Sequence, residues 1–427
     1  MELLWWGRLT IKVLSAVLLL GLFALACMAV MTRPFGLSEG WWALVAAGLG
    51  LATGLVSLGA AWGSLSTTVD VLLFFGGLLL LTAVLSQAGA LDLLVDCMER
   101  WSKGSSRRLL VATVAVTALV TVLFSNDAAA LLLAPALIAR VRRHGLPSAP
   151  FLVAVALIAN TASLVLPVSN PVNLLLLDRD HIPLPQYLAT VTPAALVGLG
   201  LVALVVVMAS WRRLPAAIPA PASESAWDSR LLVALGALLL ALAAIDVTCG
   251  ALGLPLGPPA LAAGVLAAAG WALRSHGSPR HLLVAVPWSL LPLVAGFAVL
   301  AAGLERSGLL GGLAQVVVGS QSSLAAQFRV GLATAGVAGL LNNLPAAFLV
   351  SSGLAASHHL AGLVVPVIAG ADLGPNLAPA GSLSTILIFN IARRHGESPP
   401  WGRFWRLGWV VGPVGLVASL GVLAVMR

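Results

Sequence analysis

Apolar residues fill the chain in blocks of about 20, and short polar or Gly- and Pro-rich stretches separate the blocks. A block of this length allows an α-helix to cross the hydrocarbon core of a bilayer. Tryptophans gather at the block ends, as is typical of membrane interfaces. The pattern predicts an all-α polytopic membrane protein with about ten transmembrane helices. Its uninterrupted spans are predicted at residues 11–31, 41–61, 69–89, 186–210, 231–250, 256–273, 287–306 and 404–426.

Four apolar blocks contain polar interruptions. They lie at residues 125–127, 160–173, 342–345 and 370–384. Non-helical backbone at membrane depth is tolerated only where it is buried in protein or lines a water-filled cavity. We therefore expect two re-entrant helical hairpins, at 108–142 and 327–357, and two broken helices, at 150–178 and 360–392. An amphipathic segment at 90–101 is expected to lie along the membrane surface.

The two halves of the chain resemble each other. The segment that starts at Ile158 aligns with the one that starts at Ile368, and the pair Asn126-Asp127 falls opposite Asn342-Asn343. Interruptions at matching positions of two inverted repeats are the best sequence pointer to the binding site of a secondary transporter. We predict a first repeat over 1–213, a cytoplasmic linker over 214–229 and a second repeat over 230–427.

Charge predicts the orientation of the repeats. Basic residues such as Arg108 and Arg143 flank both ends of the first hairpin, whereas the second hairpin has only Arg329 nearby. Positively charged loops stay in the cytoplasm, so the first hairpin should open to the cytoplasm and the second to the outside. Most of the 23 Lys and Arg residues then lie inside, and both termini lie outside. Arg8 and Lys12 conflict with that placement of the N-terminus.

Composition excludes several classes of function. Of the 427 residues, 60% are hydrophobic and 9% are charged, against about 25% charged in soluble domains, so the chain is not a soluble enzyme. Its pI near 10.9 reflects Lys and Arg between spans, so no nucleic-acid partner is expected. The sequence has no P-loop, GxSxG or HExxH motif, and its three cysteines lie far apart. We expect no enzyme activity, no metal centre and no cofactor.

The polar interruptions indicate the chemistry of the site. They contain Asn, Ser, Thr and Gly, two carboxylates and no basic residue. Such a lining suits a small uncharged solute with hydroxyl groups, or a partly hydrated ion, better than a dicarboxylate, which would usually recruit Arg. The two carboxylates, Asp127 and Asp372, are our candidates for proton coupling, because an acidic residue inside a membrane is costly unless it has a function. The alternative is that each caps a helix, and the two roles are compatible.

At these interruptions the sequence resembles a known family. The segments are SNDAAALLLAPALIA (125–139), ANTASLVLPVSNPVNLL (159–175), LLNNLPAAFLVSSGL (340–354) and GADLGPNLAPAGSLSTIL (370–387). They look like the signature segments of the arsenical pump membrane proteins, which belong to the ion transporter superfamily. The resemblance implies export of arsenite or antimonite, as the neutral hydroxide, in exchange for protons across the inner membrane. It also implies an inverted-repeat fold and, in some systems, a cytoplasmic ATPase partner.

The resemblance carries a set of substrate-binding residues onto this chain, with Asp127 and Asp372 as the proton-coupling pair. These residues are Ser125, Asn126, Asn160, Thr161, Ser163, Ser169, Asn170, Asn173, Asn342, Asn343, Gly374, Asn376 and Ser382. The chain departs from the family pattern at three positions. Asn160 stands where we expect an acid, Asn376 where we expect Lys, and Ala378 where we expect Thr. These changes put the coupling stoichiometry and the substrate in question.

Two other functions stay open. A sodium/proton antiporter or an organic-anion carrier of the same superfamily would show sodium-dependent flux or inhibition by carboxylates. A passive facilitator of small neutral solutes would show flux that is indifferent to a pH gradient and to Asp127→Asn.

Overall fold

The computed structural model describes residues 2–179, 182–217, 229–275, 279–319, 324–358 and 362–426, and within these ranges it is all-helical. The first part of the chain forms α1 (Glu2–Thr32), α2 (Glu39–Ala52), α3 (Leu58–Gln87), α4 (Ala90–Ser102), α5 (Ser106–Leu123), α6 (Asn126–Arg143), α7 (Ala149–Ala162), α8 (Pro171–Arg179) and α9 (Leu184–Trp211). The second part forms α10 (Ser229–Leu252), α11 (Gly257–Ser275), α12 (Pro279–Ala285), α13 (Leu290–Ser307), α14 (Leu309–Val318), α15 (Leu324–Leu341), α16 (Asn343–Ala356), α17 (Val364–Leu373), α18 (Leu383–Arg394) and α19 (Trp401–Val425). Short 3-10 turns lie at η1 (Pro34–Gly36), η2 (Pro167–Ser169), η3 (Gly374–Leu377) and η4 (Pro379–Gly381).

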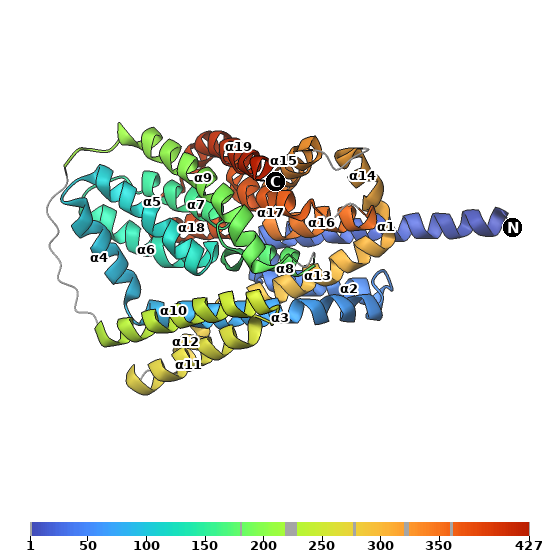
Figure 1. Ribbon diagram of the computed structural model, residues 1–427, viewed down its shortest axis with the longest axis horizontal. Coiled ribbons are helices and arrows are strands. Elements are labelled where there is room, and N and C mark those ends of the chain that lie inside the picture. Colours follow the sequence, from blue (N-terminus) through green and yellow to red (C-terminus); the bar gives the residue numbers. More distant parts are fainter. Residues whose placement is uncertain are drawn as a thin grey trace.

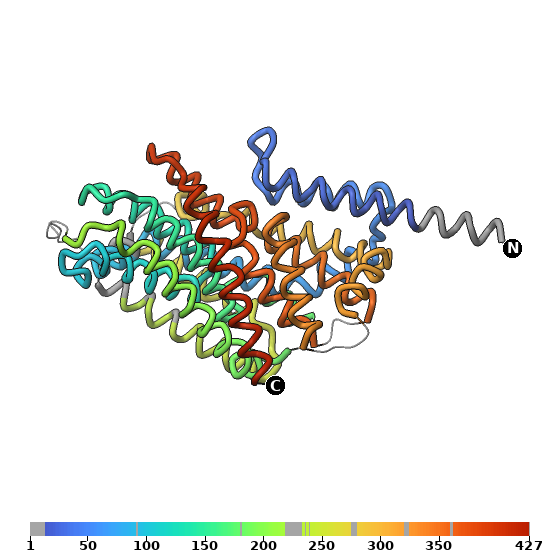
Figure 2. Tube along the Cα trace, turned by 90° about the horizontal axis from the view of Figure 1, so that it is seen from above, coloured from blue at the N-terminus to red at the C-terminus, as the bar shows by residue number. Residues whose placement is uncertain are grey.

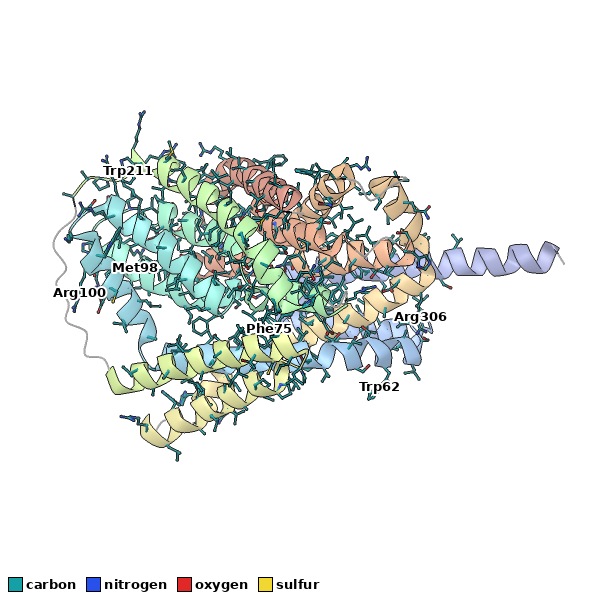
Figure 3. The ribbon with its side chains drawn as sticks, viewed as in Figure 1. Trp62, Phe75, Met98, Arg100, Trp211 and Arg306 are labelled. Atoms are coloured by element: carbon teal, nitrogen blue, oxygen red, sulfur yellow. The ribbon has the colours of Figure 1, made fainter. Side chains whose placement is uncertain are left out.

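The molecule is elongated, and its long axis gives it two ends (Figure 1). Arg100 and Trp211 mark one end, and Trp62 and Arg306 mark the other (Figure 3). We call the first the basic end, because α6, α9 and α18 finish there and α19 begins there. Its arginines are Arg142, Arg143, Arg212, Arg213, Arg393, Arg394, Arg403 and Arg406. Figure 2 shows α1 and α2 side by side at one edge, with α19 crossing the face of the molecule.

Seven described helices are long and apolar enough to cross a membrane by length and composition. They are α1, α3, α5, α9, α13, α15 and α19. The shorter apolar helices include α7, α16 and α17, which end at the polar interruptions. The coarse prediction of an all-helical polytopic membrane protein is confirmed, and the seven described helices of this kind are fewer than the ten predicted crossings.

One predicted boundary is wrong. The spans expected at 41–61 and 69–89 are α2, which ends at Ala52, and the 30-residue α3, which begins at Leu58. A turn at Gly54, whose φ is +73°, ends the first helix, and the Ser57 hydroxyl accepts a hydrogen bond from Ala60 N at 3.2 Å to start the second. The chain therefore turns near the middle of the block that we expected to be one helix.

The predicted hairpins and broken helices correspond to pairs of helices. Residues 108–142 form α5 and α6, and residues 327–357 form α15 and α16. The broken helices are α7 with α8, joined through η2, and α17 with α18, joined through η3 and η4. The hairpin α5–α6 lies toward the basic end and α15–α16 toward the opposite end (Figure 1). Most of the linker expected at 214–229 lies outside the described residues.

Glycines hold the second broken helix directly against α15. A Cβ atom at Gly374 would meet the carbonyl oxygen of Ala335, and one at Gly381 would lie 2.9 Å from the carbonyl oxygen of Ala338. On its other side, Gly408 of α19 touches the carbonyl oxygen of Asn376. Small residues let backbones approach this closely inside a membrane. The interruption at 374–381 is therefore clamped between α15 and α19.

Buried ion pairs fasten the amphipathic α4 to the base of the first hairpin. Arg140 of α6 pairs with both Asp96 and Glu99 of α4, and His144 lies 2.5 Å from Glu99. The acidic face of α4 is thus turned onto α6. At the opposite end, Glu305 pairs with Arg179 of α8.

Candidate functional site

Two helix N-termini carry the polar tips of the hairpins. The Ser125 hydroxyl caps α6 by accepting a hydrogen bond from Ala128 N at 3.0 Å. Asn342 caps α16 through Oδ1, which accepts from Leu344 N at 3.3 Å. Asn342 has a φ of +92°, a conformation that Asn tolerates better than most residues. Ser125 and Asn342 are thus the equivalent cap residues of the two hairpins. This shifts the alignment by one residue from the one based on the sequence, so that Asn126 corresponds to Asn343 and not to Asn342.

The two tips meet at a small cavity between the halves of the chain. Its volume is about 20 Å³, room for about one water molecule. Its lining consists of Asn126, Asp127, Asn170, Pro171, Leu290, Leu293, Val294, Asn342, Asn343, Leu344, Ser382 and Leu383. These residues include the first residues of α6, α8, α16 and α18. Four helix N-termini therefore converge on one point, and we call this space the tip cavity.

The tip cavity combines positive dipole ends with one carboxylate. A helix N-terminus presents unpaired N–H groups and a partial positive charge, which favour oxygen ligands. Asp127 is the acidic residue of the lining, and no Lys or Arg belongs to it within the described chain. The site can therefore stabilise oxygen ligands at four positive helix ends and accept hydrogen bonds at one carboxylate.

One amide donor at the tip cavity lacks an acceptor among the described residues. Asn342 is 1% exposed, and its Nδ2 has no hydrogen-bond partner among the described residues. Buried amide groups are nearly always paired, because an unpaired donor costs the free energy of desolvation. A ligand in the cavity would supply the missing acceptor.

Asp372 lies beside the tip cavity and not on its lining. Its Oδ1 accepts from Asn170 Nδ2 at 2.6 Å, and its Oδ2 accepts from Asn173 Nδ2 at 2.8 Å. Asn173 Nδ2 also donates to the carbonyl oxygen of Ser163 at 2.9 Å. This buried cluster joins the first broken helix to the second.

A second buried cluster of hydrogen bonds also joins the two broken helices. Asn160 Nδ2 lies 3.2 Å from Asn376 Oδ1 and 3.3 Å from Thr385 Oγ1. Asn376 Nδ2 donates to Thr161 Oγ1 at 3.0 Å, and Ser384 Oγ donates to Asn160 Oδ1 at 3.4 Å. Two of the three positions at which the sequence departs from the expected family pattern, 160 and 376, belong to this cluster and contact each other.

The predicted site residues thus fall into two groups. Those that line the tip cavity are Asn126, Asp127, Asn170, Asn342, Asn343 and Ser382. Those that surround it are Ser125, Asn160, Thr161, Ser163, Ser169, Asn173, Asp372, Gly374 and Asn376. Ser169 Oγ donates to the carbonyl oxygen of Val122 at 3.0 Å, which ties η2 to the first hairpin.

Sequence reasoning missed two sets of residues. Leu290, Leu293 and Val294 of α13 form an apolar wall of the tip cavity, and nothing distinguishes them from other residues of an apolar block. Ser384 and Thr385 belong to the Asn160 cluster. Thr385 lies 212 residues after Asn173, two more than the offset of 210 that aligns Ile158 with Ile368, so a repeat alignment shifted by two residues would have found it.

Larger clefts lie on either side of the tip cavity. Toward the opposite end is a cleft of about 410 Å³, and a narrow apolar gap separates it from the tip cavity. That gap is lined by Val172, Leu175, Leu176, Leu344, Ala347 and Phe348. A cavity of about 120 Å³ reaches Asp127 from the other side, past Thr82 and Leu132. Cavities therefore adjoin the hairpin tips on both sides.

Comparison with known proteins identifies the family. The family described as citrate transporter (CitMHS) matches residues 17–371. The chain belongs to this family. It is a secondary transporter and not an enzyme, as the sequence predicted.

Within the citrate transporter family, the chain is similar over its length to proteins named arsenical pump membrane protein. It is 29% identical to one from Escherichia coli K12 and 27% identical to one from Yersinia enterocolitica. Each alignment covers 94% of this chain and 97% of the relative. The resemblance inferred from the four polar segments is thereby confirmed.

One solved structure shares the fold. The YdaH transporter of Alcanivorax borkumensis, which has an unusual topology, superposes with a TM-score of 0.56 at 16% identity. The match covers 88% of both chains. At this identity the likeness concerns the fold alone.

Proposed function

We propose that this protein exports trivalent arsenite or antimonite, in exchange for protons, through the tip cavity. The full-length relatives named arsenical pump membrane protein support this substrate. The observation that carries the proposal is the meeting of four helix N-termini and one carboxylate, Asp127, on a single small cavity.

The lining suits a neutral trihydroxide. As(OH)₃ offers three hydroxyl groups, which donate to the Asp127 carboxylate and to Asn side-chain oxygens. Its oxygen lone pairs accept from the helix N-termini and from Asn342 Nδ2, the donor that lacks a partner. Release follows when Asp127 takes a proton from the outside, because a protonated carboxyl group loses most of its acceptor strength toward the substrate hydroxyls.

An organic anion is the second candidate, because the family is described as citrate transporter and helix N-termini attract carboxylates. The carboxylate of Asp127 disfavours this candidate. Two like charges about 4 Å apart repel by about 4 kcal/mol at an effective dielectric constant near 20. The described lining holds no Lys or Arg that would offset this repulsion.

The proposed arrangement in the membrane follows from charge. The basic end faces the cytoplasm, so the hairpin α5–α6 enters from inside and α15–α16 from outside. The two halves are inverted repeats, each with five crossings and one re-entrant hairpin, in the inner membrane. A cytoplasmic ATPase would meet the arginines of the basic end.

Transport requires the tip cavity to widen. Its 20 Å³ holds about one water molecule, whereas As(OH)₃ has four heavy atoms. The substrate therefore binds after the hairpin tips separate toward one side, as in transporters that alternate access around a central site.

The substrate is tested with purified protein in liposomes. Uptake of arsenite, antimonite and citrate is measured side by side, with and without sodium, under the same imposed pH gradient. We expect uptake of arsenite and antimonite that does not require sodium and that citrate does not inhibit. Uptake of citrate in preference to arsenite would refute the proposal in favour of the organic-anion carrier. Arsenite flux that is indifferent to the pH gradient would refute it in favour of the passive facilitator.

A further inference from the structure

We infer that Asp372 and Asn160 are positioning residues, each of which holds the first turn of the other half's short helix toward the tip cavity. Asp372, in the last turn of α17, accepts hydrogen bonds from Asn170, which precedes α8, and from Asn173 in the first turn of α8. Asn160, near the end of α7, binds Ser384 and Thr385, which begin α18. The inference rests on the proposed function, because it assigns separate parts to residues of the same site.

The Asp372 contacts require two acceptors at this position. Asn170 Oδ1 accepts from Val172 N at 3.2 Å, which orients its Nδ2 toward Asp372. Asn173 Nδ2 donates both to Ser163 O and to Asp372, while Asn173 Oδ1 has no partner in the described chain. Both amides are therefore fixed with a donor toward position 372. A carboxylate can accept from both, whereas the amide of Asn would present a donor to one of them.

The Asn160 contacts occupy the matching positions of the other half. An offset of 212 residues relates Asn160 to Asp372 and Asn173 to Thr385, so the contacts Asp372–Asn173 and Asn160–Thr385 correspond. The backbone agrees with this offset. Asn170 has φ and ψ of −150° and 130°, and Ser382, 212 residues later, has −138° and 132°.

The crossed contacts explain how four helix N-termini reach one cavity. The short helices α8 and α18 follow non-helical stretches, so the helix that precedes each of them does not fix its direction. In each case the last turn of the other half's helix supplies the polar partner. Asp372 therefore has a different role from Asp127. Asp127 lines the tip cavity, whereas both carboxylate oxygens of Asp372 accept hydrogen bonds from Asn side chains beside it.

The test combines hydrogen exchange with transport, using full-length protein. Asp372→Asn should speed amide exchange in the segment 171–179 about tenfold, and Asn160→Ala should do so in 383–394. Each effect then falls on the helix of the opposite half. Asp246→Asn, a buried carboxylate of α10 away from the site, is the matched control and should change neither segment.

A charge exchange tests the hydrogen-bond geometry. In the double variant Asn170→Asp with Asp372→Asn, the carboxylate at position 170 accepts from Val172 N and from the amide at 372, whose oxygen accepts from Asn173 Nδ2. All three contacts are restored, and only the hydrogen bond between positions 170 and 372 changes direction. We expect Asp372→Asn to lower flux about tenfold with its dependence on the pH gradient unchanged, and the double variant to recover the slow exchange of 171–179.

Three results would overturn the inference. They are unchanged exchange in 171–179 for Asp372→Asn, faster exchange confined to the substituted residue's own helix, and loss of pH-gradient dependence for Asp372→Asn. The exchange experiment needs no substrate. If the wild-type protein does not move arsenite but the two variants show the crossed exchange pattern, the proposed function is refuted and the inference stands.

Discussion

Phe348 closes the path between the 410 Å³ cleft and the tip cavity, and removal of its ring should make the protein leak protons. The ring is 9% exposed and lines both the 410 Å³ cleft and the apolar gap of about 10 Å³ beneath it. Leu344, one turn earlier on α16, lines both the gap and the tip cavity. In Phe348→Ala the missing ring would leave roughly 100 Å³, the volume of about three water molecules. Water could then reach Asp127 while the hairpins stay closed.

The assay is proton entry into liposomes that contain the purified protein and no substrate, followed with a pH-sensitive dye inside. We expect Phe348→Ala to admit protons at several times the wild-type rate, and Phe348→Leu, which keeps most of the volume, to lie between the two. Phe75→Ala is the control, because Phe75 is also buried, at 3% exposed, and lines none of the cavities described above (Figure 3). The cavity left by Phe348→Ala costs about 2 kcal/mol in the free energy of unfolding. Folded protein is therefore selected by gel filtration first.

Equal proton entry in wild type and Phe348→Ala would refute the reasoning. So would an equal leak in Phe75→Ala, because the effect would then come from loosened packing and not from the path.

Three further substitutions test separate parts of the structure. Asn342→Ala removes the unpartnered amide donor and should raise the arsenite KM about tenfold in a liposome uptake assay. It also removes the cap of α16 and places Ala at a φ of +92°, so the melting temperature should fall as well. Gly408→Ala places a methyl group against the Asn376 carbonyl and should lower both the melting temperature and the flux, whereas Gly421→Ala, which meets open space, should change neither. Arg140→Gln leaves Glu99 without its arginine partner and should destabilise the purified protein by about 3 kcal/mol in thermal unfolding.

The interruptions of the apolar blocks could be located from the sequence because their residue types are unambiguous. Ser125, Asn126 and Asp127 stand between two apolar runs, and such a group has no place inside a lipid-facing helix. The turn at Gly54 was missed because its neighbours are apolar or small, so only the backbone conformation reveals it. Hydropathy finds helix ends where they are polar and overlooks them where they are not.

The contacts within the site could not be predicted from the sequence. Asp372 and Asn170 are 202 residues apart, and no local pattern shows that one holds the other. The sequence placed Asp127 and Asp372 together because both are acidic residues at interruptions. Their positions relative to the cavity, which decide between carrying a proton and holding a helix, depend on how the two halves pack.

The central claim is tested most directly in inside-out membrane vesicles, by arsenite uptake under an imposed gradient with the lumen acidic. The variants compared are wild type, Asp127→Asn and the control Asp246→Asn. We predict gradient-driven uptake in wild type and in Asp246→Asn, and loss of that uptake in Asp127→Asn. Uptake that persists in Asp127→Asn with the same dependence on the gradient, or wild-type vesicles that accumulate no arsenite, would contradict the account.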